Sequence, residues 1–250
     1  MALHHVNYYS NVLGKAMGAY VIHPDASVPR PYHCMLLLHG YSDDYTIWQR
    51  RTSIERYVDG KPLIVVMPDG GHSFYVNAVN GYQYLDAIAD ELPDHLKHWY
   101  NIDGGWCTAG LSMGGYGALR VALAHPGFFR SAVSHSGSLM IGHNYPTAGA
   151  GHRADDDGFL RQQVLNFGDV KETGGPNDLL ALVNAADPKP AIRIDVGTED
   201  FLLDQNRGMH KLFTDAGIEH EYEEFPGAHT WEYWDKHIQE AIAFNLRKLG

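Results

Sequence analysis

The stretch Trp106–Arg120 constrains the fold more than any other part of this 250-residue chain. Its first residues, Trp106–Ala109, predict the end of a buried strand, and the residues after Gly115 predict a helix. Between them, residues 110–114 read GLSMG and fit the pattern G-x-S-x-G. So tight a strand-to-helix turn strains its central residue and needs glycines where side chains would collide with neighbouring elements. The hydroxyl of Ser112 is then held at a helix N-terminus, where backbone N–H groups favour negative charge.

The rest of the chain predicts strands and helices that alternate around this turn. Leu3–Ser10 and Ala16–His23 predict an antiparallel pair of strands at one sheet edge. The continuous apolar runs Tyr32–His39 and Leu63–Met67 predict strands covered on both faces. Further strands are expected at Trp106–Ala109, Ser131–Ser134, Ala191–Gly197 and Glu219–Phe225, and helices at Tyr82–Tyr100, kinked by Pro93, and at Trp231–Leu249. This alternation predicts a single α/β domain over residues 1–250, with a mostly parallel sheet and helices on both faces.

Residues 136–189 interrupt the alternation. The segment is rich in glycine, contains the acidic run Asp155–Asp157, and carries apolar residues such as Phe159 and Phe167 that short helices could bury. Long insertions between sheet elements often cover an active site. We therefore predict a cap-like insertion with short helices, and the alternative is a disordered surface loop.

The net charge and the cysteine content limit which binding partners and which cellular compartment are expected for this protein. The formal net charge is -11, which argues against nucleic acid or an anionic membrane as a main partner. The two cysteines, Cys34 and Cys107, lie in apolar runs and are expected to be unpaired, with a disulfide conceivable only if their strands are neighbours. The N-terminus does not resemble a signal peptide, and no run reaches the ~18 apolar residues of a membrane span. We expect a cytoplasmic protein, and a homo-oligomer is compatible with the sequence.

A serine hydroxyl at neutral pH is a poor nucleophile unless a base and an acid that orients the base lie nearby. In chains with this turn, the acid follows a late strand, and the histidine comes after it. Asp200 follows the strand Ala191–Gly197 and is the predicted acid, with Glu199 and Asp204 as alternatives. Asp200 could instead only cap the helix that begins near Phe201.

His229 is the predicted base because it lies between the last strand and the last helix. Its Nδ1 would donate to Asp200, and its Nε2 would take the proton of Ser112. His135, at the end of a strand on the same sheet edge, is the main alternative. Three other histidines are less well placed: His125, His220 and His237.

The negative charge that develops on an attacked carbonyl oxygen needs two backbone donors. We predict the N–H groups of Tyr41 and Met113, with Gly40 allowing the backbone close to the substrate. Other expected substrate contacts are aromatic or imidazole side chains near strand ends: Trp48, His72, Phe74, Tyr75 and Trp231. His72 and Asp69 have no further partners at metal-ligand spacing, so we expect no metal and no cofactor.

Five motifs in order resemble the esterase D family of α/β hydrolases, especially its short tributyrin-esterase-like members. They are LLLHGYSDDYTIW (Leu36–Trp48), VVMPDGGHSFY (Val65–Tyr75), AGLSMGGYGAL (Ala109–Leu119), GTEDFLLDQN (Gly197–Asn206) and PGAHTWEYWDKHI (Pro226–Ile238). The resemblance implies Ser112 as nucleophile, Asp200 as acid and His229 as base, with Tyr41 and Met113 as oxyanion donors. The family also includes S-formylglutathione hydrolases, feruloyl and acetyl-xylan esterases, and mycolyltransferases.

The expected activity is that of a serine carboxylesterase acting on small-molecule esters with short acyl chains. Alternatives within the family are a feruloyl or acetyl esterase on plant-sugar esters, an acyltransferase, and an S-formylglutathione hydrolase. The last carries less weight because Ser42-Asp43-Asp44 follows Tyr41, where those hydrolases have a cysteine. An alternative from another class is a catalytically idle carbohydrate-binding relative. The insertion 136–189 matches none of the family motifs.

Overall fold

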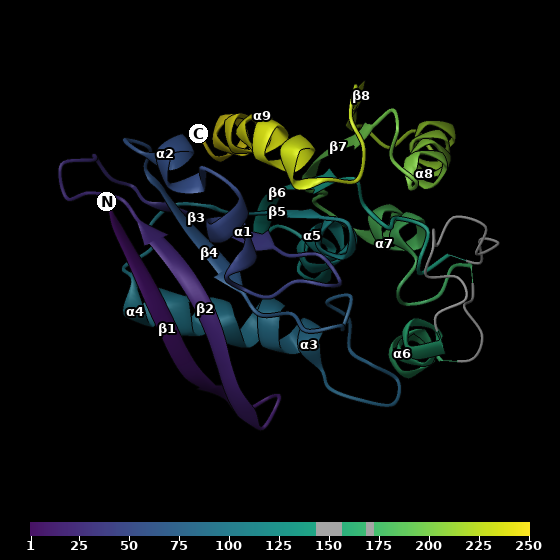
Figure 1. Ribbon diagram of the computed structural model, residues 1–250, viewed down its shortest axis with the longest axis horizontal. Coiled ribbons are helices and arrows are strands. Elements are labelled where there is room, and N and C mark those ends of the chain that lie inside the picture. Colours follow the sequence, from purple (N-terminus) through teal and green to yellow (C-terminus); the bar gives the residue numbers. More distant parts are fainter. Residues whose placement is uncertain (144–156, 169–172) are drawn as a thin grey trace.

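The computed structural model describes residues 1–143, 157–168 and 173–250, and its centre is an eight-stranded sheet (Figure 1). The strands are β1 Ala2–Ser10, β2 Lys15–His23, β3 His33–Leu38, β4 Leu63–Pro68, β5 Trp106–Leu111, β6 Phe129–His135, β7 Ala191–Gly197 and β8 Glu221–Phe225. They lie in the order β1-β2-β4-β3-β5-β6-β7-β8. Strand β2 pairs antiparallel with both β1 and β4, and all later neighbours are parallel. The predicted mostly parallel sheet with an antiparallel N-terminal edge is confirmed.

Helices cover both faces of this sheet. They are α1 Ile47–Arg51, α2 Ile54–Val58, α3 Tyr84–Asp86, the π-helical turn η1 Ala87–Glu91, α4 Leu92–Trp99, α5 Met113–Ala124, α6 Asp157–Phe167, α7 Leu179–Ala185, α8 Leu203–Asp215 and α9 Trp231–Leu249. One apolar core lies beneath α1, α2 and α9, and a larger one lies beneath α3, α4, α5, α7 and α8. Figure 1 shows α2 and α9 on one side of the strands and α3 and α4 on the other. In the described part of the chain, no helix combines the length and apolar composition needed to cross a membrane.

The predicted helix Tyr82–Tyr100 forms as three consecutive pieces, α3, η1 and α4. Proline lacks an N–H group, and its ring crowds the carbonyl four residues earlier, which predicts a kink at Pro93. In the structure, the π-helical turn lies immediately before the turn that contains Pro93. The wider turn accommodates the proline, so the helix continues through it.

Cys34 in β3 and Cys107 in β5 lie on neighbouring strands but do not form a disulfide. The register pairs Cys34 with Trp106 and Met35 with Cys107. Because successive side chains point to opposite faces of a sheet, the two thiols belong to different cores. Both are fully buried, and burial raises the pKa of the Cys34 thiol well above its usual value.

Four described residues other than glycine have a positive φ angle: Phe74 (53°), Tyr75 (56°), Ser112 (53°) and Ser136 (48°). They follow the carboxyl ends of β4, β5 and β6. Residues with a Cβ atom rarely adopt this backbone conformation, which costs about 1–3 kcal/mol per residue. Backbone strain is therefore gathered at the sheet edge where the sequence places its candidate chemistry.

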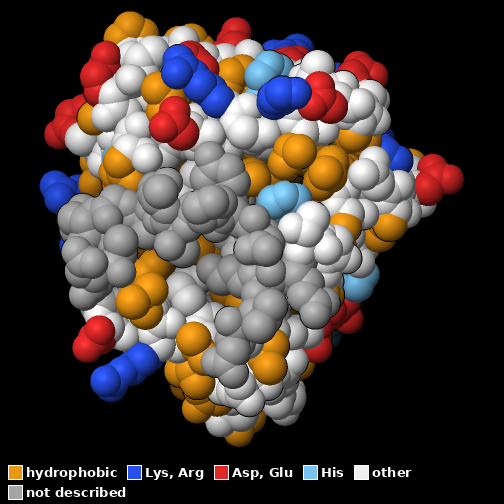
Figure 2. Space-filling view, turned by 90° about the vertical axis from the view of Figure 1, so that its right-hand side faces the viewer, with side chains coloured by type: hydrophobic (Ala, Val, Ile, Leu, Met, Phe, Trp, Pro, Cys, Tyr) orange, Lys and Arg blue, Asp and Glu red, His pale blue; other side chains and the backbone are white. Residues whose placement is uncertain are grey.

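The described part of the insertion 136–189 contains the two short helices α6 and α7, while residues 144–156 and 169–172 lie outside the described residues. Helix α6 is tied to the segment after β4, because Val79 N–H donates to Asn166 O at 3.2 Å and Asn166 Nδ2 donates to His72 O at 2.8 Å. On its outer side, Leu160 and Leu165 remain 40% and 42% exposed. Hydrophobic side chains gather on the same side of the molecule in Figure 2.

Candidate active site

Ser112 lies in the turn that joins β5 to α5. Its backbone has a φ of 53° and a ψ of -116°, and hydrogen bonds at both its N–H and its carbonyl fix this conformation. The Ser112 N–H donates to His135 O at 3.0 Å, and the N–H groups of Gly115 and Tyr116 donate to Ser112 O at 3.0 and 3.2 Å. These bonds fix the strained backbone, and the serine side chain projects from the helix N-terminus.

The two glycines of the motif are needed because backbone atoms surround them. A Cβ atom on Gly110 would lie 2.2 Å from Gly114 O, and one on Gly114 would lie 2.4 Å from Leu38 O. These neighbours are carbonyl groups of the sheet and the helix, so they cannot move aside as a flexible side chain could. The turn therefore packs directly against the end of β3.

The structure brings the three predicted catalytic side chains into one line. His229 Nε2 lies 3.0 Å from Ser112 Oγ. His229 Nδ1 lies 3.0 and 2.9 Å from the two carboxylate oxygens of Asp200. A proton on Nδ1, donated to the carboxylate, leaves Nε2 free to accept from the serine hydroxyl, which is the arrangement that general-base activation of serine requires.

Among the three acid candidates, only Asp200 contacts the imidazole. Its side chain is closed to solvent, and Leu202 N–H donates to its Oδ1 at 2.8 Å, which fixes the carboxylate. Glu199 turns the other way and accepts the N–H of Gly227 at 2.5 Å, so it ties the acid loop to the histidine loop. Asp204 lies exposed in the first turn of α8.

The alternative base, His135, belongs to a separate buried pair. Its Nδ1 lies 2.9 Å from Asp195 Oδ1, which also accepts the hydroxyl of Tyr233 at 2.9 Å. The ring is fully buried, so it cannot exchange a proton with a substrate that enters from solvent. The remaining histidines that the sequence offered have other partners: His125 with Asp90, His220 with His210 and His237 with Glu240.

The predicted oxyanion loop lies directly against the serine turn. A Cβ atom on Gly40 would be 2.8 Å from Leu111 Cδ1 and 3.8 Å from Ser112 Cβ, so only glycine lets this backbone approach Ser112 so closely. Met113 is the first residue of α5, and the first N–H groups of a helix have no partner within the helix. The N–H groups of Tyr41 and Met113 remain the predicted oxyanion donors.

Two buried side chains, Tyr75 and His39, brace this loop. The hydroxyl of Tyr75 accepts the His39 N–H at 3.0 Å and donates to His39 O at 3.1 Å. Gly70 N–H donates to His39 Nε2 at 2.8 Å, so the proton of the neutral ring lies on Nδ1, which donates to Gly40 O at 2.8 Å. The backbone around Gly40 is thus held from the strand side and from the segment after β4.

Tyr75 was expected near the substrate, but the structure places it in the core. Its ring is fully buried, and a Cβ atom on Gly70 or Gly117 would lie only 2.4 or 2.2 Å from it. Burial raises the pKa of its hydroxyl far above the usual value, so the group stays a neutral donor. Phe74 is also buried, which leaves neither ring a surface for substrate in this conformation.

Comparison with known proteins now identifies the family, because residues 10–244 match the Esterase family. The chain belongs to the Esterase family. It is 28% identical to an acetyl esterase of Caldicellulosiruptor saccharolyticus, over 97% of both chains. These findings confirm the predicted esterase D-like grouping of α/β hydrolases and the predicted class of carboxylic ester hydrolase.

Two solved structures from Staphylococcus aureus resemble this esterase over almost their full length. The fluorophosphonate-binding serine hydrolase FphF is 28% identical with a TM-score of 0.84, and the alignment covers 98% of both chains. The S-formylglutathione hydrolase FrmB is 29% identical with a TM-score of 0.81, covering 98% of this chain and 99% of the other.

Two aromatic rings that the sequence did not single out flank the imidazole of this esterase. The ring of Phe201 lies 4.4 Å from that of His229, and the ring of Trp234 lies edge-on at 4.8 Å. Trp234 Nε1 donates to Ser136 Oγ at 3.3 Å. Their positions in the sequence could have indicated these contacts. Phe201 directly follows Asp200, and Trp234 lies in the first turn of the helix after the loop that carries His229. These contacts restrict the rotation of the His229 imidazole.

An aromatic cluster lies beside the oxyanion loop. The exposed ring of His72 stacks on Tyr41 at 4.3 Å with an interplanar angle of 15°. The ring of Phe159 in α6 packs edge-on against the ring of Tyr41, with centroids 5.1 Å apart. Helix α6 therefore reaches the loop that carries Gly40, and the ring of His72 is exposed.

The two predicted tryptophan contacts differ in accessibility. Trp48 is fully buried, and its Nε1 donates to Leu38 O at 3.1 Å, so it stabilises the end of β3 and offers no open surface. Trp231 is half-buried and packs edge-on against Trp48 at 5.3 Å. No three His, Cys, Asp or Glu side chains within residues 1–143, 157–168 and 173–250 are grouped to hold a metal.

Proposed function

We propose that this esterase hydrolyses small-molecule esters of short acyl groups through an acyl-enzyme on Ser112. The observation that carries the proposal is the continuous line from Asp200 through His229 to Ser112, with contacts of 2.9 and 3.0 Å. The similarity to an acetyl esterase supports a short acyl group. The exposed stacked ring of His72 and the apolar outer side of α6 offer contacts to an aromatic or sugar-bearing ester, as in feruloyl or acetyl esters of plant sugars.

The reaction proceeds in two proton-balanced halves. Ser112 Oγ attacks the acyl carbon while its proton passes to His229 Nε2, and the carbonyl oxygen takes the negative charge between the N–H groups of Tyr41 and Met113. His229 then gives the proton to the leaving alcohol, and the acyl-enzyme remains. Water attacks the acyl carbon, its proton passes to His229 and then to Ser112, and the free acid leaves. Asp200 stabilises the imidazolium that forms twice in this cycle.

Hydrolysis of a thioester is the second candidate, and the similarity to an S-formylglutathione hydrolase favours it. The same side chains would carry it, because a thiolate leaving group needs less protonation than an alkoxide. The ratio of kcat/KM for S-formylglutathione to that for p-nitrophenyl acetate separates the two. A ratio far above one would assign the chain to the thioester substrate.

The test is the Ser112→Ala variant with Ser138→Ala as its matched control. Ser138 is a nearby serine whose N–H donates to Ser112 O, and we place its hydroxyl outside the reaction. Ser112→Ala should lower kcat/KM for p-nitrophenyl acetate by more than ~10³-fold and abolish labelling by a fluorophosphonate probe. Ser138→Ala should keep both. Unchanged hydrolysis by folded Ser112→Ala would refute the proposal. If the wild type with an added alcohol released esters of that alcohol in place of free acid, the activity would be acyl transfer.

A further inference from the structure

Arg120 is a buried cation that forms no ion pair with a carboxylate in the described part of the chain. It lies on α5, and only 8% of its surface is exposed. Its Nε donates to the neutral side chain of Asn177 at 3.3 Å, and no described carboxylate forms an ion pair with it. Buried charged side chains are almost always paired, since an isolated charge loses its hydration. Burial correspondingly lowers the pKa of this guanidinium.

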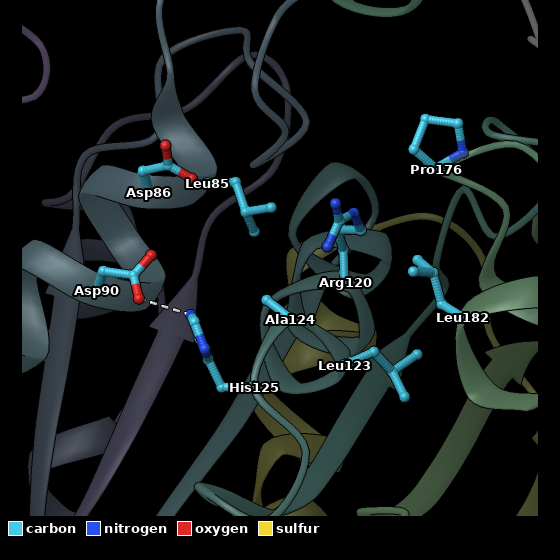
Figure 3. A pocket seen from close by; sticks show the side chains of 9 residues that line it. All are labelled: Leu85, Asp86, Asp90, Arg120, Leu123, Ala124, His125, Pro176 and Leu182. Atoms are coloured by element: carbon cyan, nitrogen blue, oxygen red, sulfur yellow. Dashed lines mark ion pairs between the residues drawn. The ribbon is translucent and has the colours of Figure 1, made fainter. Parts of the chain in front are cut away.

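The guanidinium projects into a pocket of about 350 Å³ between α3, η1, α5 and α7 (Figure 3). Apolar side chains form most of its wall: Leu85, Leu123, Leu182 and Pro176. In Figure 3, the Arg120 side chain lies between Leu85 on one side and Pro176 and Leu182 on the other. The pocket therefore offers one guanidinium beside an apolar wall, at a size that suits a small ligand.

The two aspartates at the pocket are occupied elsewhere. Asp90 Oδ1 lies 2.6 Å from His125 Nε2, as the dashed line in Figure 3 shows. Asp86 accepts the side-chain amide of Asn77 at 2.6 Å and donates its own N–H to Asn77 Oδ1 at 3.2 Å. Neither forms an ion pair with Arg120, although the negative charge of Asp86 acts on the guanidinium and opposes the lowering of its pKa. Both would repel a ligand with two negative charges. The charge pattern favours an anion with a single charge.

We propose that this pocket binds a small monocarboxylate with a short apolar tail. The carboxylate would accept the paired N–H groups of the Arg120 guanidinium, whose planar fork matches its two oxygens. The tail would pack on Leu85, Leu123 and Leu182. A phosphate dianion fits less well because of Asp86 and Asp90.

The pocket is separate from the catalytic serine. Arg120 lies eight residues after Ser112, the N-cap residue of α5, which corresponds to about 12 Å along the helix axis. The fully buried ring of Tyr116 lies between them on the helix, and its hydroxyl donates to Asn177 O at 2.8 Å. Binding here therefore does not depend on the proposed catalytic chemistry, although an acid released from a short ester belongs to the same class of ligand.

The experiment measures Tm in the Ser112→Ala background, with sodium butyrate, sodium chloride or sodium phosphate at equal ionic strength. Butyrate should raise Tm in a saturable way, as expected for a ligand that binds only the folded state, and the other two salts should not. Adding Arg120→Met should remove the butyrate effect. Without ligand, Arg120→Met should melt at the same temperature or higher, because it removes an unpaired buried charge.

A second variant, Ala124→Leu, fills the pocket and leaves Arg120 in place, which separates loss of the site from loss of folding. It should weaken the butyrate effect more than the effect of formate, which has no tail. Equal butyrate shifts with and without Arg120, no shift with any carboxylate, or a larger shift with phosphate would each overturn the proposal. These results would leave the proposed esterase activity untouched, because they do not involve turnover.

Discussion

Removing the hydroxyl of Tyr75 should reduce catalysis although this group lies outside the reacting centre. The hydroxyl bridges the N–H and the carbonyl of His39, immediately before Gly40. In Tyr75→Phe, the ring should stay packed between Gly70 and Gly117, so the variant isolates the two hydrogen bonds. The loop would then keep its sequence and lose its brace.

The expected magnitude follows from the burial of the groups involved. A net hydrogen bond contributes about 1 kcal/mol, and the buried His39 N–H left without an acceptor costs a further ~1–3 kcal/mol. We expect the free energy of unfolding to fall by about 2–4 kcal/mol. Complete loss of an oxyanion donor lowers kcat by ~100-fold or more, and a displaced donor loses part of this. We therefore expect kcat to fall ~10- to 100-fold with little change in KM.

The assay is steady-state hydrolysis of p-nitrophenyl butyrate together with urea unfolding. Tyr8→Phe is the matched control, because the Tyr8 hydroxyl is buried and has no hydrogen-bond partner among the described residues. That variant should keep kcat and lose no stability. If Tyr75→Phe lowered stability while kcat stayed within about twofold of the wild type, or if only KM changed, the loop would not depend on this brace.

Three further predictions concern the turn, the base and the pH range. Gly114→Ala should abolish activity and destabilise the fold, because the added Cβ atom would collide with the carbonyl at the end of β3. Gly208→Ala, at an open position of α8, should instead stabilise the fold by about 0.5–1 kcal/mol, and thermal unfolding checks both variants. His229→Gln should lower kcat by more than ~10³-fold, whereas His135→Gln should keep most activity and lose about 2 kcal/mol of stability; comparable losses of kcat would contradict the assignment of the base. Burial lowers the pKa of His33, so the unfolded chain takes up a proton below about pH 6.5 that the folded chain resists. Stability should therefore fall as pH drops from about 7 to 5, and less so in His33→Gln, which urea unfolding at each pH would show.

The proximity of the catalytic candidates could be predicted from connectivity alone. Ser112 follows β5, Asp200 follows β7 and His229 follows β8. Parallel strands bring their carboxyl ends to one edge of the sheet, so the order of motifs along the chain was enough to place the three together. The continuous apolar runs likewise identified the central strands to within a few residues, since buried parallel strands leave little room for polar side chains.

Roles that depend on side-chain direction could not be predicted in the same way. Trp48 and Tyr75 lie near strand ends, where an aromatic ring can face the core or the substrate, and sequence spacing does not distinguish these directions. The bracing role of His39 depends on its ring linking the carbonyl of the adjacent Gly40 to the N–H of Gly70, 31 residues away in the chain. From the sequence, Arg120 would be placed on the exposed side of its helix, but in the structure neighbouring elements cover it.

Because Phe74, Tyr75, Ser112 and Ser136 have positive φ angles, we expect the turns that contain them to be less resistant to heat than the rest of the fold. Each of these residues is kept in a costly conformation by the packing around it, and all lie along one rim of the sheet. As temperature loosens that packing, these turns should relax before the central strands separate. Hydrolytic activity would then disappear while most secondary structure persists, so an inactivated sample can still look folded by circular dichroism.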